Sequence, residues 1–146
     1  MAEEDLIEGE LTRSVVGAFF EVYNTMGYGF LEHIYVQAME RELTARGHAV
    51  AREVSVPVFY KNEPLGSQRL DIVVDRVLIV EVKSTQVLPP AALRQLYSYL
   101  HGTGLTFGLL LHFGPVAKFY RQILTKPRRP NLQSDVPSEE KGDIGT

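Results

Sequence analysis

The sequence predicts a mixed α/β fold in which helices flank one sheet. Three segments repeat their apolar residues every three or four positions, as helices do, and five shorter segments have the composition and spacing of strands. In chain order they read helix, helix, strand, strand, strand, helix, strand, strand. Because 146 residues with a hydrophobic fraction of 45% suffice for one core, we expect a single folded domain over residues 1–125.

The first helix is expected over residues 6–27, where an apolar stripe ends at Gly27. A second apolar stripe, made by Val16, Phe20 and Tyr23, runs along another side of the same helix. A helix that is apolar on two sides needs two surfaces to pack against. We therefore expect a second copy of the chain to cover one side, giving a homo-oligomer through this helix. The main stripe consists of Ile7, Leu11, Val15, Ala18, Phe19, Val22 and Met26.

A second helix is expected over residues 30–47, ending at the next glycine, Gly47. Its unusual residue is Glu32, because the positions that share its side of the helix are apolar. A carboxylate on the apolar side of a helix is rare unless something pairs with it. Glu32 is therefore a candidate functional residue. The apolar residues beside it are Tyr35, Val36, Met39 and Leu43.

From residue 51 the apolar period changes from that of a helix to that of a strand. Pro57 within this strand indicates a sheet edge or a bulge, because proline cannot donate a ladder hydrogen bond. The stretch KNEPLG, residues 61–66, predicts a turn. The remaining elements are strands near 67–75 and 77–84, a helix over residues 88–102 that starts at Pro89 and Pro90 and ends at Gly102, and strands at 105–114 and 116–123.

Composition and charge exclude several kinds of protein. No apolar run approaches the roughly 20 residues of a membrane helix, and the acidic start MAEEDLIEGE differs from a secretory signal, so we expect a cytoplasmic protein. The absence of cysteine excludes disulfides, thiolate zinc sites and a cysteine nucleophile. A net charge of −3 lacks the basic character of a tight non-specific nucleic-acid binder, although an acidic metal site inflates the negative count until its cation binds. Residues 126–146 are rich in proline and charge, which is typical of a flexible tail.

Three charged residues stand inside apolar strands, in the stretch RLDIVVDRVLIVEVKST. Strand alternation puts Glu81 and Lys83 on one face. Asp71 comes opposite Glu81 if the strands are joined by an odd number of residues or contain a bulge, whereas a two-residue loop would pair Asp71 with Val80. Because unpaired charges are costly in an apolar setting, we predict the odd-numbered connection and a shared site for the two carboxylates.

Two converging carboxylates repel each other unless they are protonated or bridged by a cation. Carboxylate oxygens suit Mg²⁺ or Mn²⁺, and the neighbouring Lys83 could position or deprotonate a water molecule or offset charge on a phosphate. Glu32 could close the site as a further metal ligand or through the water shell of the metal. In the third helix Gln95 and Tyr99 share a face and could orient water or contact a phosphate. The pattern indicates metal-assisted hydrolysis of a phosphodiester bond.

These residues, in this order, resemble the PD-(D/E)XK nuclease superfamily, and the Gln-x-x-x-Tyr spacing of the third helix resembles a feature of its RecB-like branch. The run GFLEHIY, residues 29–35, resembles the motif for which the GxxExxY family is named. The resemblance covers residues 6–124. Leu70 stands where the superfamily name has proline, and His112 stands where the family more often has asparagine.

The resemblance implies a restriction-endonuclease-like mixed β-sheet flanked by helices, in the order ααβββαββ. It also implies that Asp71, Glu81 and the carbonyl of Val82 bind the metal, that Lys83 assists catalysis, and that the substrate is DNA or RNA. Two alternatives stay open on the sequence, because a fold can lose its chemistry. One is a catalytically silent nuclease-fold protein that assembles into a structural homo-oligomer, and the other is a nucleic-acid binder that does not cleave.

Overall fold

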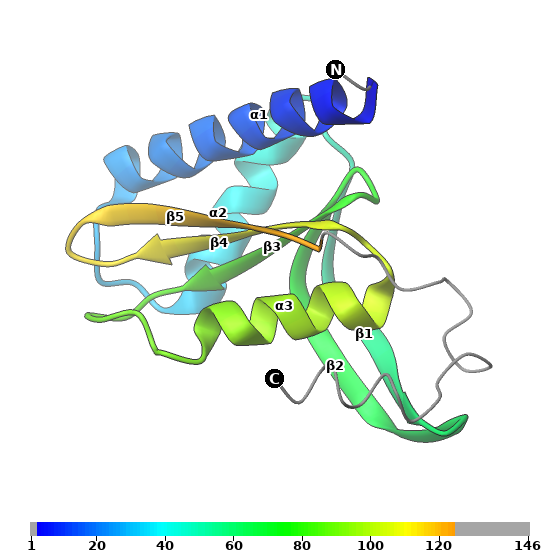
Figure 1. The fold of residues 1–146 in the computed structure, drawn as a ribbon. Coiled ribbons are helices and arrows are strands. Elements are labelled where there is room, and N and C mark those ends of the chain that lie inside the picture. The colour runs from blue at the N-terminus through cyan, green and yellow to red at the C-terminus, as the bar shows by residue number, and fades with distance from the viewer. Residues whose placement is uncertain (1–2, 125–146) are drawn as a thin grey trace.

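The computed structural model describes residues 3–124, and its elements follow the predicted order (Figure 1). The mixed α/β class and the order ααβββαββ are confirmed. Within the described residues, no helix is long and apolar enough to cross a membrane. The expected tail, residues 126–146, lies outside the described part. The helices are α1 (Glu3–Met26), α2 (Glu32–Ala45) and α3 (Ala92–Thr103), and the strands are β1 (Val50–Tyr60), β2 (Glu63–Val74), β3 (Leu78–Lys83), β4 (Phe107–Phe113) and β5 (Ala117–Ile123).

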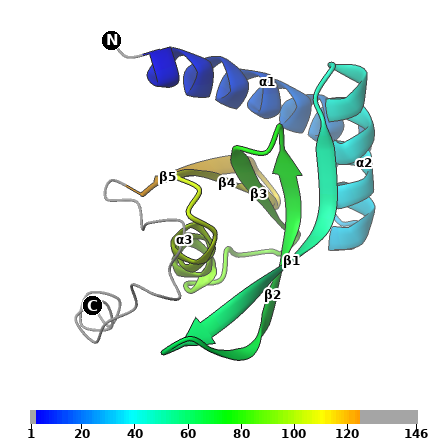
Figure 2. The same ribbon diagram turned by 90° about the vertical axis from the view of Figure 1, so that its right-hand side faces the viewer.

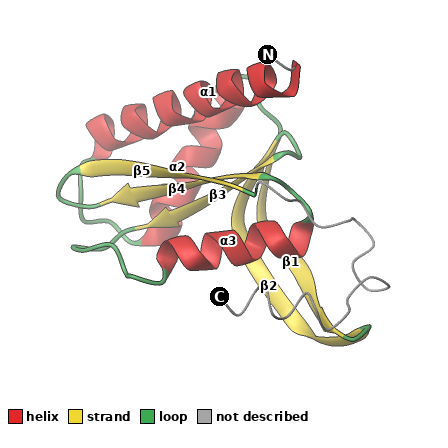
Figure 3. Cartoon of the chain, in the orientation of Figure 1, coloured by secondary structure: helices red, strands yellow, loops and turns green. Residues whose placement is uncertain are grey.

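The five strands form one mixed sheet in the order β1-β2-β3-β4-β5. Strands β3 and β4 run parallel, and the other neighbouring pairs are antiparallel. A parallel pair needs a crossover connection, and α3 supplies it (Figure 3). Strand β1 is an edge strand, as Pro57 predicted, and its register shifts between Val58 and Phe59.

Helices cover both faces of the sheet. Helices α1 and α2 lie on one face and α3 lies on the other (Figure 2). Alternate residues of β3 enter the two apolar cores: Val80 and Val82 pack under α1 and α2, whereas Ile79 packs against α3. Glu81, two residues after Ile79, therefore points to the α3 face.

The second apolar stripe of α1 is covered in part by its own sheet. Val16 and Tyr23 pack against the core under α1 and α2, and the hydroxyl of Tyr23 donates to the carbonyl of Gly114 over 2.6 Å. Phe20 stays 36% exposed and meets Phe119 of β5 edge to face, with ring centroids 6.4 Å apart. The homo-oligomer through α1 stays a prediction, with Phe20 as an exposed aromatic residue of that helix.

Several boundaries differ from those expected; α3, for example, begins at Ala92 and not at Pro89 and Pro90. At two of them the backbone angles give the reason. Lys61 and Asn62 have φ angles of 48° and 69°, so a two-residue turn joins β1 to β2 and the rest of KNEPLG belongs to β2. Helix α3 continues through Gly102 and ends where Gly104 takes a φ of 79°. Two glycines stand close together here, and the one that adopts the left-handed conformation ends the helix.

The ladder between β1 and β2 is interrupted at Glu53, which has a φ of 53°. The register leaves Glu53 opposite Asp71 without pairing between them, and the ladder resumes with Val54 and Leu70. In a regular strand Leu70 and Ile72 would lie on the same face of the sheet. Here Ile72 packs under α1 and α2 whereas Leu70 packs against α3, so the side chains of β2 change faces at this interruption. Asp71 lies at the switch between the two faces.

A chain of side-chain hydrogen bonds joins three elements next to α1. His48 Nε2 lies 2.7 Å from Ser14 Oγ, and its Nδ1 lies 2.7 Å from Asp75 Oδ2 in the β2–β3 connection. The other oxygen of Asp75 accepts the backbone N–H of Ala49 over 2.8 Å. Ser14 stands within α1, where the backbone N–H groups are engaged in helical hydrogen bonds, and the guanidinium of Arg46 donates to its carbonyl oxygen over 3.5 Å. We interpret this chain of hydrogen bonds as structural, a clasp that holds α1, the segment before β1 and the β2–β3 connection together.

His48→Ala is expected to lower the free energy of unfolding by about 2 kcal/mol, because it removes two side-chain hydrogen bonds and leaves Ser14 and Asp75 without their partner. Urea denaturation at neutral pH measures this loss. His33→Ala is the matched control, since His33 is exposed and makes no hydrogen bond within the described residues. Equal stability of His48→Ala and the parent would show that the clasp contributes nothing.

Candidate active site

The connection between β2 and β3 places Asp71 opposite Glu81. The ladder ends at the pair of Val74 and Leu78, so three residues, 75–77, form the connection. The predicted odd-numbered connection is confirmed. Continuing the register beyond the ladder pair of Ile72 and Val80 brings Asp71 opposite Glu81, on the strand that also carries Lys83.

Where the β2–β3 ladder stops, the side chain of Asp71 accepts the next backbone hydrogen bond from β3. Its Oδ2 accepts the backbone N–H of Val82 over 2.9 Å, just past the ladder pair of Ile72 and Val80. In an extended strand the N–H and C=O of one residue project to the same edge. The carbonyl of Val82 therefore faces the edge on which the Asp71 carboxylate lies.

Glu81 is buried, with only 5% of its surface exposed, and it interacts directly with Asp71. Among the described residues, its Oε2 is a buried side-chain oxygen with no hydrogen-bond partner. Burial first, and then the charge of Asp71, raise the pKa of Glu81 from its ordinary 4.5 to about 9, while Lys83 acts in the opposite direction. Without a cation, the Glu81 carboxyl is therefore protonated at neutral pH.

Helix α3 brings Tyr99 to the carboxylate pair. Tyr99 is 6% exposed, and burial together with the charges of Glu81 and Asp71 raises its pKa to about 12. Its hydroxyl therefore stays a neutral donor. Gln95, one turn earlier on the same helix, is exposed and makes no side-chain hydrogen bond within the described part of the chain. The predicted pair is thus divided, with Tyr99 next to the carboxylates and Gln95 at the surface.

Glu32 does not join the carboxylate pair. It begins α2, and its Oε2 accepts the backbone N–H of Ser84, the residue after Lys83, over 3.2 Å. Among residues 3–124, no three His, Cys, Asp or Glu side chains form a group that could hold a metal. The structure therefore does not bring Glu32 together with Asp71 and Glu81 as a third ligand. A backbone N–H holds it at the end of β3 instead.

The loop after Lys83 is anchored from the neighbouring strand. His112, which pairs with Lys83 in the parallel ladder, is buried, and its Nε2 lies 2.9 Å from the carbonyl oxygen of Thr85. A Cβ at Gly114 would lie 2.8 Å from His112 Cε1, so the glycine leaves room for the ring. Lys83 itself is half-buried. Its pairing with His112 and the contact of His112 with Thr85 hold the backbone of Lys83 in place.

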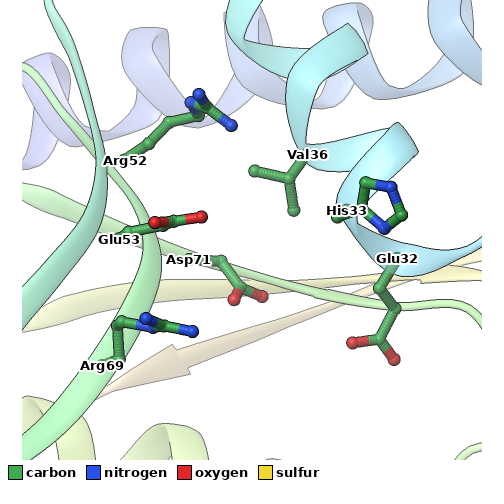
Figure 4. Close-up of a pocket in the computed structure, with 7 residues that line it drawn as sticks. All are labelled: Glu32, His33, Val36, Arg52, Glu53, Arg69 and Asp71. Atoms are coloured by element: carbon green, nitrogen blue, oxygen red, sulfur yellow. The ribbon is translucent and has the colours of Figure 1, made fainter.

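A pocket opens beside Asp71, between the first turn of α2 and strands β1 and β2 (Figure 4). Arg69, two residues before Asp71, points its guanidinium into this space and makes no hydrogen bond or ion pair within the described residues. Arg52 instead forms an ion pair with Glu40, with 2.9 Å between Nε and Oε1. The pocket is also lined by Glu32, His33, Val36 and Glu53.

The interpretation of the sequence missed Arg69. The available signal was its spacing of two residues from Asp71, which places both on one side of a regular strand. That spacing does not reveal that the first turn of α2 completes a pocket around them. An unpaired guanidinium beside the carboxylates is suited to bind an anion such as a phosphate.

The oxygen atoms at this site fit a hard divalent cation. Glu81 and Asp71 face each other, and Glu81 keeps a buried oxygen without a partner. The carbonyl of Val82 lies on the same edge. Two carboxylates and a carbonyl are ligands that Mg²⁺ and Mn²⁺ prefer. A cation there would favour the ionised form of Glu81, which the metal-free site disfavours.

Comparisons with known proteins agree with this geometry. The family model of the PD-(D/E)XK nuclease superfamily matches residues 9–123, a range that includes all five strands, α2, α3 and most of α1. No curated protein matches the chain. The matched range contains both carboxylates, Lys83 and Tyr99, so the family assignment and the site concern the same part of the molecule.

Proposed function

The chain belongs to the PD-(D/E)XK nuclease superfamily, and on this basis we propose that it is a metal-dependent nuclease that hydrolyses phosphodiester bonds in DNA or RNA. The observation that carries the proposal is the buried Glu81 carboxyl, which faces Asp71 and keeps an unpaired oxygen two residues before Lys83. Membership of the GxxExxY family and of the RecB-like branch is part of the same proposal. It is supported by GFLEHIY and by the spacing of Gln95 and Tyr99.

Each residue of the site has a role in this proposal. Asp71, Glu81 and the carbonyl of Val82 would hold Mg²⁺ or Mn²⁺, and a cation held there would supply polarisation of the phosphoryl group and a lower pKa of water. The ammonium of Lys83 donates to a phosphate oxygen and offsets the charge that grows there. Overall, the oxygen of water bonds to phosphorus and the water gives up one proton, while the bond from phosphorus to the leaving nucleotide oxygen breaks and that oxygen takes up one proton.

Three further residues support these groups. With a pKa of about 12, the hydroxyl of Tyr99 stays protonated and donates a hydrogen bond to water or phosphate beside the carboxylates. Glu32 holds the backbone N–H of Ser84 and so fixes the chain directly after Lys83. Gln95, exposed one turn before Tyr99 on α3, orients water or contacts a phosphate of the substrate.

The direct test incubates the chain with labelled single-stranded, double-stranded and branched DNA and RNA, in Mg²⁺, in Mn²⁺ and in EDTA. We expect cleavage that depends on the cation. Lys83→Ala is expected to cleave about 100- to 1,000-fold more slowly, because the loss of one donor that stabilises developing charge has an effect of this size. The initial rate on the best substrate measures the difference.

Lys118→Ala is the matched control, since Lys118 is an exposed lysine on β5. Lys83→Arg keeps the positive charge at the site and is expected to cleave at a rate between those of the parent and Lys83→Ala. Melting temperatures of all variants should lie close to that of the parent. If the parent cuts no substrate, or if Lys83→Ala cuts as fast as the parent, the nuclease function is wrong and a catalytically silent role takes its place.

A further inference from the structure

Four apolar side chains lie exposed next to the end of β3. Tyr28, Phe30 and Leu31 belong to the loop between α1 and α2 and are 40%, 47% and 69% exposed. Val87 belongs to the loop between β3 and α3 and is 74% exposed. The two loops lie side by side (Figure 1), and the hydroxyl of Tyr28 joins them by donating to Gln86 Oε1 over 3.0 Å. We call these four side chains the apolar rim.

The ring of Phe30 is held in a fixed position within the apolar rim. Its backbone N–H donates to Tyr35 Oη over 3.3 Å, and its carbonyl accepts the hydroxyl of Ser84. The ring meets that of Tyr35 edge to face, at 5.9 Å between centroids and an interplanar angle of 83°. Tyr35 is fully buried and stacks on Phe113 at 4.0 Å. Phe30 therefore presents an exposed aromatic surface without losing conformational freedom on binding.

The apolar rim adjoins the residues proposed for catalysis. Ser84, which contacts both Phe30 and Glu32, directly follows Lys83 in the chain. Leu31 directly precedes Glu32, which also lines the pocket beside Asp71. A phosphodiester held at Lys83 therefore has its neighbouring nucleotides within reach of the apolar rim.

Unpaired positive charge lies in the same region. Arg69 has no partner within the described residues, and its pocket is lined by Glu32 and His33 at the start of α2. A guanidinium without a partner is suited to bind a phosphate of a nucleic-acid backbone. Proteins bind single-stranded nucleic acids by combining exposed aromatic surfaces with basic groups, and here the basic group is Arg69.

We propose that the apolar rim stacks on unpaired bases, so that the substrate is a single strand or the unpaired part of a longer molecule. This inference rests on the proposed nuclease function and specifies its substrate class. Within a duplex each internal base is covered on both faces by neighbouring base pairs, so an aromatic side chain cannot stack on it unless the base leaves the helix. Phe30 is the residue on which the selectivity depends most, because its ring is aromatic, exposed and fixed.

Fluorescence anisotropy tests the proposal with labelled DNA and RNA of about 15 nucleotides, single-stranded or as blunt duplexes of the same sequence. Binding is measured in EDTA, which prevents metal-dependent cleavage, and again in Ca²⁺. The parent is expected to bind single strands at least about 10-fold more tightly than duplexes. Phe30→Ala is expected to weaken single-strand binding by about 5- to 50-fold and to leave duplex binding unchanged.

Further variants separate stacking from other effects. Phe30→Tyr keeps an aromatic ring and should bind as the parent does, whereas Phe30→Leu keeps only apolar surface and should bind as weakly as Phe30→Ala. Phe119→Ala is the matched control, since Phe119 is 41% exposed on β5, away from β3. In salt titrations Phe30→Ala should keep the slope of the parent, whereas Arg69→Ala should lower it by about one phosphate contact.

Equal affinity of the parent for single strands and duplexes, or unchanged binding by Phe30→Ala, overturns the inference even if the protein cleaves nucleic acid. Single-strand binding that needs Phe30, in a protein that cleaves nothing, supports the inference and contradicts the nuclease function. If the apolar rim instead binds a second copy of the chain, light scattering will show a mass that changes with Phe30→Ala while nucleic-acid binding does not. That result also overturns the inference.

Discussion

Asp71→Asn is expected to abolish cation binding at the candidate site and to slow cleavage by about 1,000-fold or more. The change removes one of two carboxylates that hold the cation, and with it the charge that polarises the phosphate. The fold should persist, because the amide oxygen of asparagine can still accept the backbone N–H of Val82. The effect on activity is therefore a consequence of lost charge at one position and not of unfolding.

Calorimetric titration with Mn²⁺ measures the loss of binding independently of activity. The rise in melting temperature that a bound cation produces gives a second measure, and it should be absent in Asp71→Asn. Glu53→Gln is the matched control, since Glu53 lines the same pocket and stands opposite Asp71 in the register, yet has no interaction with Glu81. Cation affinity equal to that of the parent in Asp71→Asn would contradict a site built from two carboxylates.

The pairing of Asp71 with Glu81 could be predicted from the sequence because strand alternation has a strict period of two. Charged residues inside apolar strands need a partner or a bound cation. Asp71 and Glu81 can share one cation only if they lie opposite each other, which requires an odd-numbered connection. The ladder shows this connection, of three residues. The same reasoning predicted the order of the elements, since Gly27, Gly47 and the proline pair before α3 end or begin helices for local reasons.

Other parts of the site could not be predicted, because they depend on backbone conformation and on contacts between distant segments. A glutamate has no special preference for a positive φ, so nothing in the sequence indicates that Glu53 interrupts the ladder opposite Asp71. Glu32 was expected to close the site as a further metal ligand or through the water shell of the metal. In the structure its carboxylate accepts the backbone N–H of Ser84, 52 positions along the chain, and helical spacing cannot reveal such a contact.

Glu81→Gln is expected to make the metal-free protein more stable at neutral pH, by about 3 kcal/mol at pH 7. The pKa of Glu81 in the folded chain, about 9, lies above the ordinary value of 4.5. Below pH 4.5 the carboxyl is protonated in the folded and the unfolded chain, so its contribution to stability is fully present. As the pH rises toward 9, only the unfolded chain ionises, and stability falls by about 1.4 kcal/mol per pH unit. Glutamine does not ionise in this pH range, so the free energy of unfolding of Glu81→Gln does not fall in this way.

Urea denaturation in EDTA at several pH values measures the difference between Glu81→Gln and the parent. The difference should be small at pH 5 and grow steadily as the pH rises toward 9. Glu63→Gln, which changes an exposed carboxylate on β2, should show no such trend. Because a bound cation favours the ionised carboxylate, Mg²⁺ should stabilise the parent above pH 7 and leave Glu81→Gln unchanged. A pH-independent difference would mean that Glu81 ionises freely in the folded chain, and the buried, shared carboxylate site on which cation binding depends would then not exist.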